Sequence, residues 1–254
     1  MSRKRLDVLL VERGLAESRS QAQALVMAGR VRGHAKAGEQ VDEAAALELV
    51  PAPPYVSRAG RKLAHALDRF AVDPHGLDCL DIGASTGGFT DVLLQRGAAR
   101  VIALDVGHGQ LHARLRGDPR VIVCERQNAR ALTELPFPPA LVTCDVSFIS
   151  VRIALPPALA LARPGWQALV LVKPQFEARR GEARKGIIRD PEVQRRVLRE
   201  LSTALTRFDA RLAGVVDSGL PGAKGNREFV CHFVHAAHPG LPAELERWID
   251  DAVG

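Results

Sequence analysis

The chain has 254 residues and a mass of 27.4 kDa, which allows one large domain or a small domain joined to a medium one. With 46% hydrophobic and 25% charged residues, its composition is that of a globular protein and excludes a mainly disordered chain. The 35 Lys and Arg against 29 Asp and Glu give a net charge of +6 and a pI near 9.5, which permits a polyanionic partner without proving one.

The cysteines and the apolar stretches indicate in which cellular compartment the protein is expected. The four cysteines are far apart in sequence and include no C-x-x-C pair, which argues against a disulfide scaffold and against a structural zinc or other metal site. No N-terminal stretch resembles a signal peptide. The longest apolar stretch, residues 153–162, is too short to span a bilayer and contains two prolines. We therefore expect a cytoplasmic protein without a membrane partner.

Residues 1–50 are predicted to form a small α+β module. Apolar residues from Leu6 to Val11 predict a helix that stops at Gly14, and Ser18 is a candidate N-cap for a second helix over residues 19–28. Val31 and residues 47–50 indicate short strands. Residues 1–36 hold eight Lys and Arg against three acids, so this module is basic.

Residues 51–56 begin with a Pro-rich stretch and are predicted to be a linker to a domain over residues 57–240, with a C-terminal segment over 241–254. Apolar runs at 79–82, 101–104, 121–124, 141–144 and 168–172 alternate with helical segments. This alternation predicts a Rossmann-like α/β fold, with a mainly parallel sheet and helices on both faces. Two late strands, 211–216 and 228–234, are expected to pair antiparallel.

A glycine-rich turn follows the first strand of this domain, in the sequence L-D-I-G-A-S-T-G-G-F-T over residues 80–90. Ser85 stands where a dinucleotide-binding loop has the glycine nearest the pyrophosphate, and Asp81 is awkward for a phosphate but suitable for an ammonium. Asp105 ends the next strand, where it can accept from ribose hydroxyls. This pattern favours S-adenosylmethionine. NAD, or a loop that binds nothing, are the alternatives. The predicted cofactor residues are Asp81, Gly83, Ala84, Ser85, Thr86, Gly87, Gly88, Asp105 and Asn128.

Two charged residues end predicted strands of the sheet, Asp145 and Lys173. Both should point into the crevice at the carboxyl edge. Only six of the 35 basic residues are lysines, so a lysine directly after a buried strand is unusual. Arginine cannot usefully lose its proton, whereas a desolvated lysine near other cations can act as a general base. Lys62, before the first strand, and Glu228, at the last one, are further candidates. The alternative is that each is an ordinary surface charge, and spacing alone does not show that the four converge.

Two resemblances account for nearly the whole chain. Residues 3–32 resemble an S4 RNA-binding domain through R-L-D-x-L-L-x-E-R-G-L, S-R-S-x-A and A-G-R-V, although the usual polar V-N-G turn after Val31 is replaced by Arg32-Gly-His-Ala. Residues 57–235 resemble the FtsJ-like S-adenosylmethionine-dependent RNA 2′-O-methyltransferases through S-R-A-G-x-K-L, D-I-G-A-S-T-G-G-F-T, C-D-V-S-F-I-S, V-K-P-Q-F-E and G-N-x-E-F. The order of the two resembles the TlyA-type rRNA methyltransferases, also called the hemolysin A family.

The resemblance implies a Lys-Asp-Lys-Glu catalytic tetrad at Lys62, Asp145, Lys173 and Glu228. It also implies 2′-O-ribose methylation of ribosomal RNA, at cytidine in 16S or 23S rRNA. As a hypothesis, Lys173 accepts the proton of the ribose hydroxyl, helped by the charge of nearby Lys62, while Asp145 orients it. Lys62 and Glu228 would position the ribose. A membrane-acting hemolysin and a non-catalytic RNA-binding protein with this fold are the alternatives.

Ribosomal RNA or ribosomal subunits are thus the expected partner, and a monomer is slightly favoured. Two basic clusters are the predicted contact surfaces, one in each domain. They consist of Arg5, Arg13, Arg19 and Arg30 in the S4-like part, and Arg179, Arg180, Arg184 and Lys185, followed by Arg189, after Lys173. Aromatic residues are only 4% of the chain, which favours recognition through phosphate, 2′-OH and shape over base stacking. Solvated basic faces are the alternative for both clusters.

Overall fold

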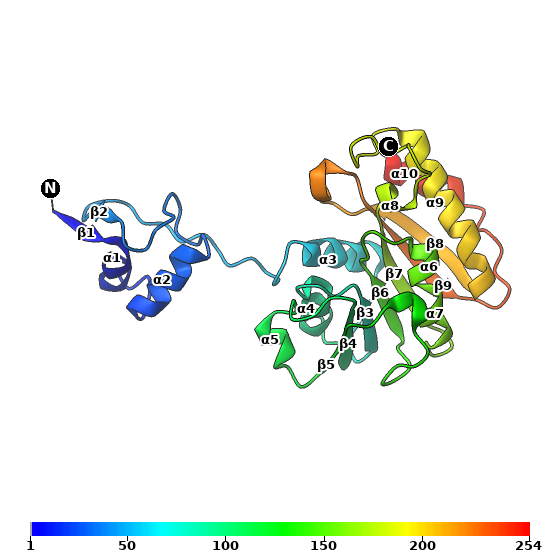
Figure 1. Ribbon diagram of the computed structural model, residues 1–254, viewed down its shortest axis with the longest axis horizontal. Coiled ribbons are helices and arrows are strands. Elements are labelled where there is room, and N and C mark those ends of the chain that lie inside the picture. The colour runs from blue at the N-terminus through cyan, green and yellow to red at the C-terminus, as the bar shows by residue number, and fades with distance from the viewer. Residues whose placement is uncertain (1) are drawn as a thin grey trace. The chain divides into compact units, whose positions relative to one another are not determined.

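The computed structural model describes residues 2–254, and the chain divides into two compact units, Met1–Pro54 and Tyr55–Gly254 (Figure 1). The division lies inside the predicted linker, where four residues include three prolines. Each unit has its own hydrophobic core.

The first unit is a small α+β module with the two predicted helices. Its elements are β1 (Arg3–Arg5), α1 (Leu6–Glu12), α2 (Arg19–Met27) and β2 (Gln40–Asp42). Ser18 caps α2 by accepting from the backbone N–H of Gln21. The antiparallel pair β1–β2 was not predicted, and the expected strands near Val31 and Leu49 form only an isolated bridge.

The second unit is built on a seven-stranded sheet in the order β5-β4-β3-β6-β7-β9-β8. Its strands are β3 (Asp78–Ile82), β4 (Arg100–Asp105), β5 (Val121–Glu125), β6 (Leu141–Cys144), β7 (Gln167–Val172), β8 (Ala210–Asp217) and β9 (Phe229–His235). β9 runs antiparallel to both β7 and β8, and the strand pairs from β5 to β7 are parallel. The predicted Rossmann-like sheet is confirmed, with each boundary within one residue.

Helices cover both faces of the sheet (Figure 1). One face packs against α3 (Ala59–Phe70), α4 (Gly88–Gln95) and the segment of α5 (Ala113–Arg116). The other packs against α6 (Val151–Ala154), α7 (Pro156–Ala160), α9 (Pro191–Leu205) and α10 (Leu245–Val253). The remaining short elements are α8 (Pro174–Glu177) and the 3₁₀ turns η1 (Ala129–Ala131), η2 (Thr206–Phe208) and η3 (Ala223–Gly225). Because α10 buries Leu245 and Ile249 in this core, the predicted C-terminal segment belongs to the second unit.

Successive side chains of β3 point to opposite faces of the sheet, and this decides which of the two helical layers each one contacts. Leu80 and Ile82 lie in the core under α6, α7 and α9, whereas Cys79 lies in the core under α3 and α4. Asp81 has the parity of Cys79 and therefore points toward α4. The chain leaves β3 to α4 through the glycine-rich turn, beside the point where the strand order reverses between β4 and β6. Ligands of doubly wound folds bind at such a switch point.

Two glycines let α3 approach the start of α4 closely. A methyl group on Gly60 would lie 2.7 Å from Cβ of Tyr55 and 2.9 Å from the carbonyl oxygen of Gly88. A methyl group on Gly88 would lie 3.0 Å from the backbone nitrogen of Gly60. These contacts fix the helix that carries Lys62 against the turn that follows β3.

We expect Gly60→Ala to destabilise the protein by about 1–3 kcal/mol, because the added methyl group overpacks a backbone contact. The sign of this change in the free energy of unfolding is informative, because alanine is otherwise favoured over glycine in a helix by about 1 kcal/mol. Urea unfolding measures the change. Gly240→Ala is the matched control, because a methyl group there meets no atom within 4 Å. A Gly60→Ala variant more stable than the parent would contradict the close-packing interpretation.

Candidate active site

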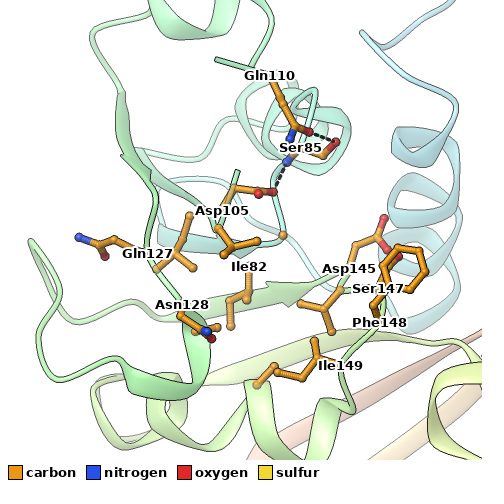
Figure 2. Close-up of a pocket in the computed structure, with 16 residues that line it drawn as sticks. Ile82, Ser85, Asp105, Gln110, Gln127, Asn128, Asp145, Ser147, Phe148 and Ile149 are labelled. Atoms are coloured by element: carbon orange, nitrogen blue, oxygen red, sulfur yellow. Dashed lines mark hydrogen bonds between the residues drawn. The ribbon is translucent and has the colours of Figure 1, made fainter. Parts of the chain in front are cut away.

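A cavity of about 350 Å³ opens at the carboxyl ends of β3, β4 and β6 (Figure 2). Its size is within the range of small-molecule sites. Figure 2 shows Asp145, Ser147 and Phe148 on one side of it and Gln127 and Asn128 on the other. The sixteen lining residues are Ile82, Gly83, Ser85, Leu104, Asp105, Val106, Gln110, Gln127, Asn128, Ala129, Asp145, Val146, Ser147, Phe148, Ile149 and Ala154.

The turn over residues 83–88 forms one wall because of its backbone conformation. Gly83 packs so closely on the end of β6 that a methyl group would lie 2.5 Å from the carbonyl oxygen of Asp145. Ser85 has a φ of 49°, in the left-handed region that normally favours glycine. Its backbone N–H donates to Asp105 Oδ2 at 2.8 Å, which holds the turn over the end of β4. A smaller hollow nearby is lined by Ala84, Thr86 and Gly88, among others, and again by Asp145. Gly87 has a φ of 95°, so a side chain there would be strained.

The donors and acceptors that line the cavity suit an adenosine-type ligand with a cationic end. Asp105 accepts from Ser85 and from the N–H of Gly107 at 2.6 Å, and its remaining lone pairs can accept from ribose hydroxyls. Asn128 caps η1 with its carbonyl oxygen, which leaves its amide nitrogen for the ligand. The lining contains two carboxylates and no Lys or Arg, so it fits S-adenosylmethionine and does not fit a pyrophosphate.

Asp81 has a different place from the one predicted. Its side chain is fully buried and does not line the cavity, so it cannot meet the ammonium group of a ligand there. Asp81 Oδ2 accepts from the backbone N–H and the hydroxyl of Thr90 at 2.9 and 2.7 Å, and Oδ1 accepts from Thr143 at 3.0 Å. The carboxyl group therefore ties β3 to α4 and β6. Burial raises its pKa to about 7 despite these hydrogen bonds.

This pKa predicts how stability changes with pH. Because the folded-state pKa of Asp81 is about 7 and the ordinary value is 3.8, the group stabilises the fold most below the ordinary value, and this stability is lost as pH rises through 7. Asp81→Asn removes the titration. Between about pH 5 and about pH 8, the free energy of unfolding of the variant relative to the parent should rise by on the order of 3 kcal/mol. Denaturant titration at several pH values measures this difference, and a difference independent of pH would contradict the assignment.

Lys173 and Asp145 form an ion pair beside the cavity. Lys173 Nζ lies 2.6 Å from Asp145 Oδ1 and donates to Ser147 Oγ at 2.8 Å. Their side chains are 12% and 18% exposed, so the pair is reachable from outside. Asp145 lines both the cavity and the smaller hollow, which places the pair at their junction.

Lys62 and Glu228 form a second ion pair that is almost fully buried. Lys62 Nζ donates to Glu228 Oε2, and their side chains are 6% and 3% exposed. A methyl group on Gly222 would overlap the Glu228 carboxylate, so the backbone of this glycine packs directly on the carboxylate. Removing one partner of a buried ion pair costs more stability than the pair contributes, because the other charge is left buried without compensation. The pair therefore serves mainly to fix the positions of its two side chains.

The sheet register brings the two pairs together. Val172 of β7 pairs with Phe229 of β9 in antiparallel register, so the next residues outward, Lys173 and Glu228, are neighbours across the two strands. The four predicted catalytic residues thus lie at one edge of the sheet. The expected crowding of positive charge is wrong, because each lysine faces its own carboxylate and the four charges balance.

Several residues around this edge were not predicted. Phe148 has a φ of 65° and is 91% exposed at the rim of the cavity. The centroid of its ring lies 5.0 Å from that of the Phe176 ring. Glu177 accepts from Ser150 Oγ at 2.6 Å, which joins the segment after β6 to the segment after β7, and burial raises its pKa. Ser147 lies in C-D-V-S-F-I-S and Glu177 in V-K-P-Q-F-E, so the family motifs were the available signal for them.

A further buried carboxylate, Asp91 on α4, supports the chain that enters α3. It accepts from the backbone N–H of Val56 at 2.8 Å and from Arg114. It therefore holds the segment before α3 against α4. Its place within an apolar helix was the sequence signal for this contact.

The predicted RNA-contact arginines of the first unit all have acceptors within the unit. Arg5 and Arg19 both pair with the buried carboxylate of Asp7, and these arginines hold the pKa of Asp7 well below its usual range. Arg13 donates to the carbonyl groups of Glu43 and Ala45, and Arg30 donates to that of Val50. These contacts brace the fold of the unit, and contact with RNA by these residues stays a prediction.

The second predicted basic cluster, after Lys173, makes fewer ion pairs and hydrogen bonds within the protein than the first. Arg179 pairs with Glu200 at 3.1 Å. Within residues 2–254, Arg180, Arg184 and Lys185 take part in no ion pair. Arg184 and Lys185 line an open hollow next to α9.

Comparison with known proteins agrees with this architecture. The family model for FtsJ-like methyltransferases matches residues 55–234, and the S4 domain model matches residues 4–32. The chain belongs to the FtsJ-like methyltransferase family. The glycine-rich turn, Asp145, Lys173 and Glu228 all fall within the matched range, and S-adenosylmethionine is the cofactor of this methyltransferase.

The chain is similar to three known proteins over most of its length. The 16S/23S rRNA (cytidine-2′-O)-methyltransferase TlyA of Mycobacterium tuberculosis is 44% identical over 240 residues, covering 89% of this chain and 88% of the relative. Hemolysin A of Brachyspira hyodysenteriae is 40% identical over 239 residues, covering 91% and 99%. A solved structure described as a hemolysin from Streptococcus thermophilus has a TM-score of 0.76 and 38% identity, covering 98% of this chain and 95% of that one.

Two further features of the structure concern membrane spans and metal sites. Among residues 2–254, no helix combines the length and apolar character that a membrane crossing requires. In the same part of the chain, no three His, Cys, Asp or Glu side chains gather closely enough to hold a metal ion.

Proposed function

We propose that this methyltransferase transfers a methyl group from S-adenosylmethionine to the 2′-hydroxyl of a cytidine in ribosomal RNA. The observation that carries the proposal is the Lys173–Asp145 pair at the mouth of the cofactor cavity, supported from behind by Lys62 and Glu228. The names of the TlyA relative and of the S4 domain support RNA, and specifically rRNA cytidine, as the substrate class.

The cofactor residues follow from the lining of the cavity. Asp105 would bind the ribose hydroxyls, Asn128 would contact the adenine, and the backbone of residues 83–88 would hold the amino-acid end. The cofactor supplies a methyl group on a sulfonium centre, which is electrophilic without help from the protein. The protein's own contribution is therefore alignment of the nucleophile and removal of its proton.

Lys173 is the proposed general base. In its neutral amine form Nζ takes the proton of the 2′-hydroxyl as the ribose oxygen bonds to the methyl carbon and the bond from that carbon to sulfur breaks. Ser147 and Asp145 hold Nζ at 2.8 and 2.6 Å and fix its direction. Lys62 and Glu228 are too buried to be the base, so we assign them the positioning of this edge.

Phe148 offers a place for the base of the target nucleotide. Its ring is exposed at the cavity rim and is supported by Phe176. An unstacked base can lie on such a ring, and enzymes that modify a nucleotide commonly take it out of its stack. This local pair offsets the small number of aromatic residues in the chain as a whole.

The S4-like unit would contribute affinity through phosphate contacts, and the substrate would be ribosomal RNA or ribosomal subunits. We further propose that the protein acts in the cytoplasm, where such substrates occur, and that it works as a monomer. Light scattering of the purified protein tests the monomer, and a dimer would contradict it.

The direct test of the function is methylation in vitro. Ribosomal subunits from a strain that lacks the protein are incubated with the purified chain and labelled S-adenosylmethionine, and 2′-O-methyl positions are mapped. We expect label in rRNA at a cytidine ribose. Absence of transfer to both subunits and to bare rRNA, with cofactor binding intact, would contradict the proposal. The same experiment separates catalysis from RNA binding alone.

Lys173→Arg should lower the methyl-transfer rate by about 10²–10⁴-fold, because arginine keeps the charge but supplies no usable base. The affinity for S-adenosylmethionine, measured by calorimetry, should stay within about twofold of the parent, since Lys173 does not line the cofactor cavity. Single-turnover transfer measures the rate. A parental rate in this variant would exclude Lys173 as the base.

A further inference from the structure

A second hollow lies outside the cofactor cavity, between the loop over residues 181–190 and the start of α9, with a volume of about 770 Å³. Its lining includes two acids with partners in the protein, and one of them, Glu182, is neutralised by an arginine. Glu182 pairs with Arg196 at 2.5 Å, and Asp190 caps α9 by accepting from the N–H of Glu192 at 2.9 Å. Three cations remain on its lining.

These cations are Arg184, Lys185 and Arg189, and within residues 2–254 none of them takes part in an ion pair. Lys224, in the turn before β9, lies at the same place, because a methyl group on Gly186 would be 3.6 Å from Lys224 Nζ. Lys185 and Lys224 also both have a left-handed backbone, with φ of 52° and 59°. The arginines of the adjacent α9, by contrast, face carboxylates, so this group of free cations is distinct from its surroundings.

A buried amide holds this loop in place. The side chain of Asn226 is 2% exposed, and its Oδ1 accepts from the backbone N–H of Ile188 while Nδ2 donates to the carbonyl of Gly186, both at 2.9 Å. Gln194 of α9 donates to the carbonyl of Ile188 at 3.2 Å. The backbone beside the free cations is therefore fixed from two sides by buried side-chain amides.

The same turn carries Glu228. Asn226 and Glu228 are two residues apart, and Gly222 connects them, since its N–H donates to the carbonyl of Asn226 and its backbone packs on the Glu228 carboxylate. One short segment thus contacts the basic loop through Asn226 and the catalytic edge through Glu228 and Lys62. Asn226 stands in the G-N-x-E-F motif and has no part in the mechanism above.

We propose that this hollow binds the phosphate backbone of the RNA strand next to the methylated nucleotide, and that Asn226 is the positioning residue that holds it in register with the catalytic edge. The inference rests on the proposed function for the identity of the strand. Free guanidinium and ammonium groups without an aromatic side chain suit phosphate oxygens rather than bases. A phosphate position fixed relative to Glu228 would fix the ribose relative to Lys173.

The test uses the full chain and three variants with a protein-free rRNA transcript. In the first, Arg184, Lys185 and Arg189 are replaced by Ala. The second is Asn226→Ala, and the third combines all four changes. The control replaces Arg207, Arg211 and Arg247, three exposed arginines outside the hollow, by Ala and removes the same charge. RNA affinity is measured at several salt concentrations, together with kcat and KM for methyl transfer.

We expect the triple variant to bind RNA at least about tenfold more weakly, and the slope of log affinity against log salt to fall by about 0.7–0.9 for each phosphate that the variant no longer neutralises. Asn226→Ala should lower the same slope and also lower kcat, with unchanged cofactor affinity. Combined with the triple variant it should cause no further reduction of RNA affinity, because it acts through those residues. The control should keep the parental slope.

Two results would overturn the inference. A triple variant with the affinity and salt slope of the parent or of the control would exclude the phosphate site. A full additional reduction from Asn226→Ala in the triple background would exclude its role through the loop, as would a fall in melting temperature with no change in slope or kcat. Methyl transfer by the parent is scored separately, so failure of the proposed function is distinguishable from failure of the hollow.

Discussion

The antiparallel register of β7 and β9 is the constraint on which the site depends. Because Val172 pairs with Phe229, Lys173 and Glu228 follow as neighbours at the carboxyl edge of the sheet. A shift of one residue would turn Glu228 to the opposite face, away from Lys62 on α3. Asp145 reaches Lys173 from the adjacent end of β6. The long-range pairing of strands thus decides which charges meet, although Lys62 and Glu228 are 166 positions apart in the chain.

The two ion pairs have different exposure and so different uses. The Lys62–Glu228 pair is buried, where desolvation of both groups offsets much of their attraction, so its value lies in a fixed geometry rather than in stability. The Lys173–Asp145 pair is partly exposed, so a ligand can reach it. Close packing at Gly60, Gly83 and Gly222 keeps the backbone next to these charges. The site is therefore closely packed around Lys62 and Glu228 and accessible at Lys173 and Asp145.

The sequence predicted the seven strands well because buried strands are continuous apolar runs, and strand ends located Asp145 and Lys173. It missed β1 and β2 because Arg3–Arg5 and Gln40–Asp42 are short and mainly polar. The burial of Asp81 follows from strand parity, which the loop motif obscured. The Lys173–Asp145 contact was expected, but the pairing of Lys62 with Glu228 was not. That pairing, the exposed ring of Phe148 and the hydrogen bonds from Asn226 to the loop over residues 181–190 depend on contacts between distant segments or on left-handed backbone, and no spacing rule encodes them.

The most direct measurement is a double-mutant cycle on the single-turnover methyl-transfer rate, with Lys62→Met, Glu228→Gln and the double variant. If the two side chains act only as a pair that positions the catalytic edge, each single change leaves the other group buried without its partner. The double variant should then be no slower than the worse single variant, a coupling of at least about tenfold. Rate reductions that multiply, so that the double variant equals the product of the singles, would show that the residues act independently and would contradict the account.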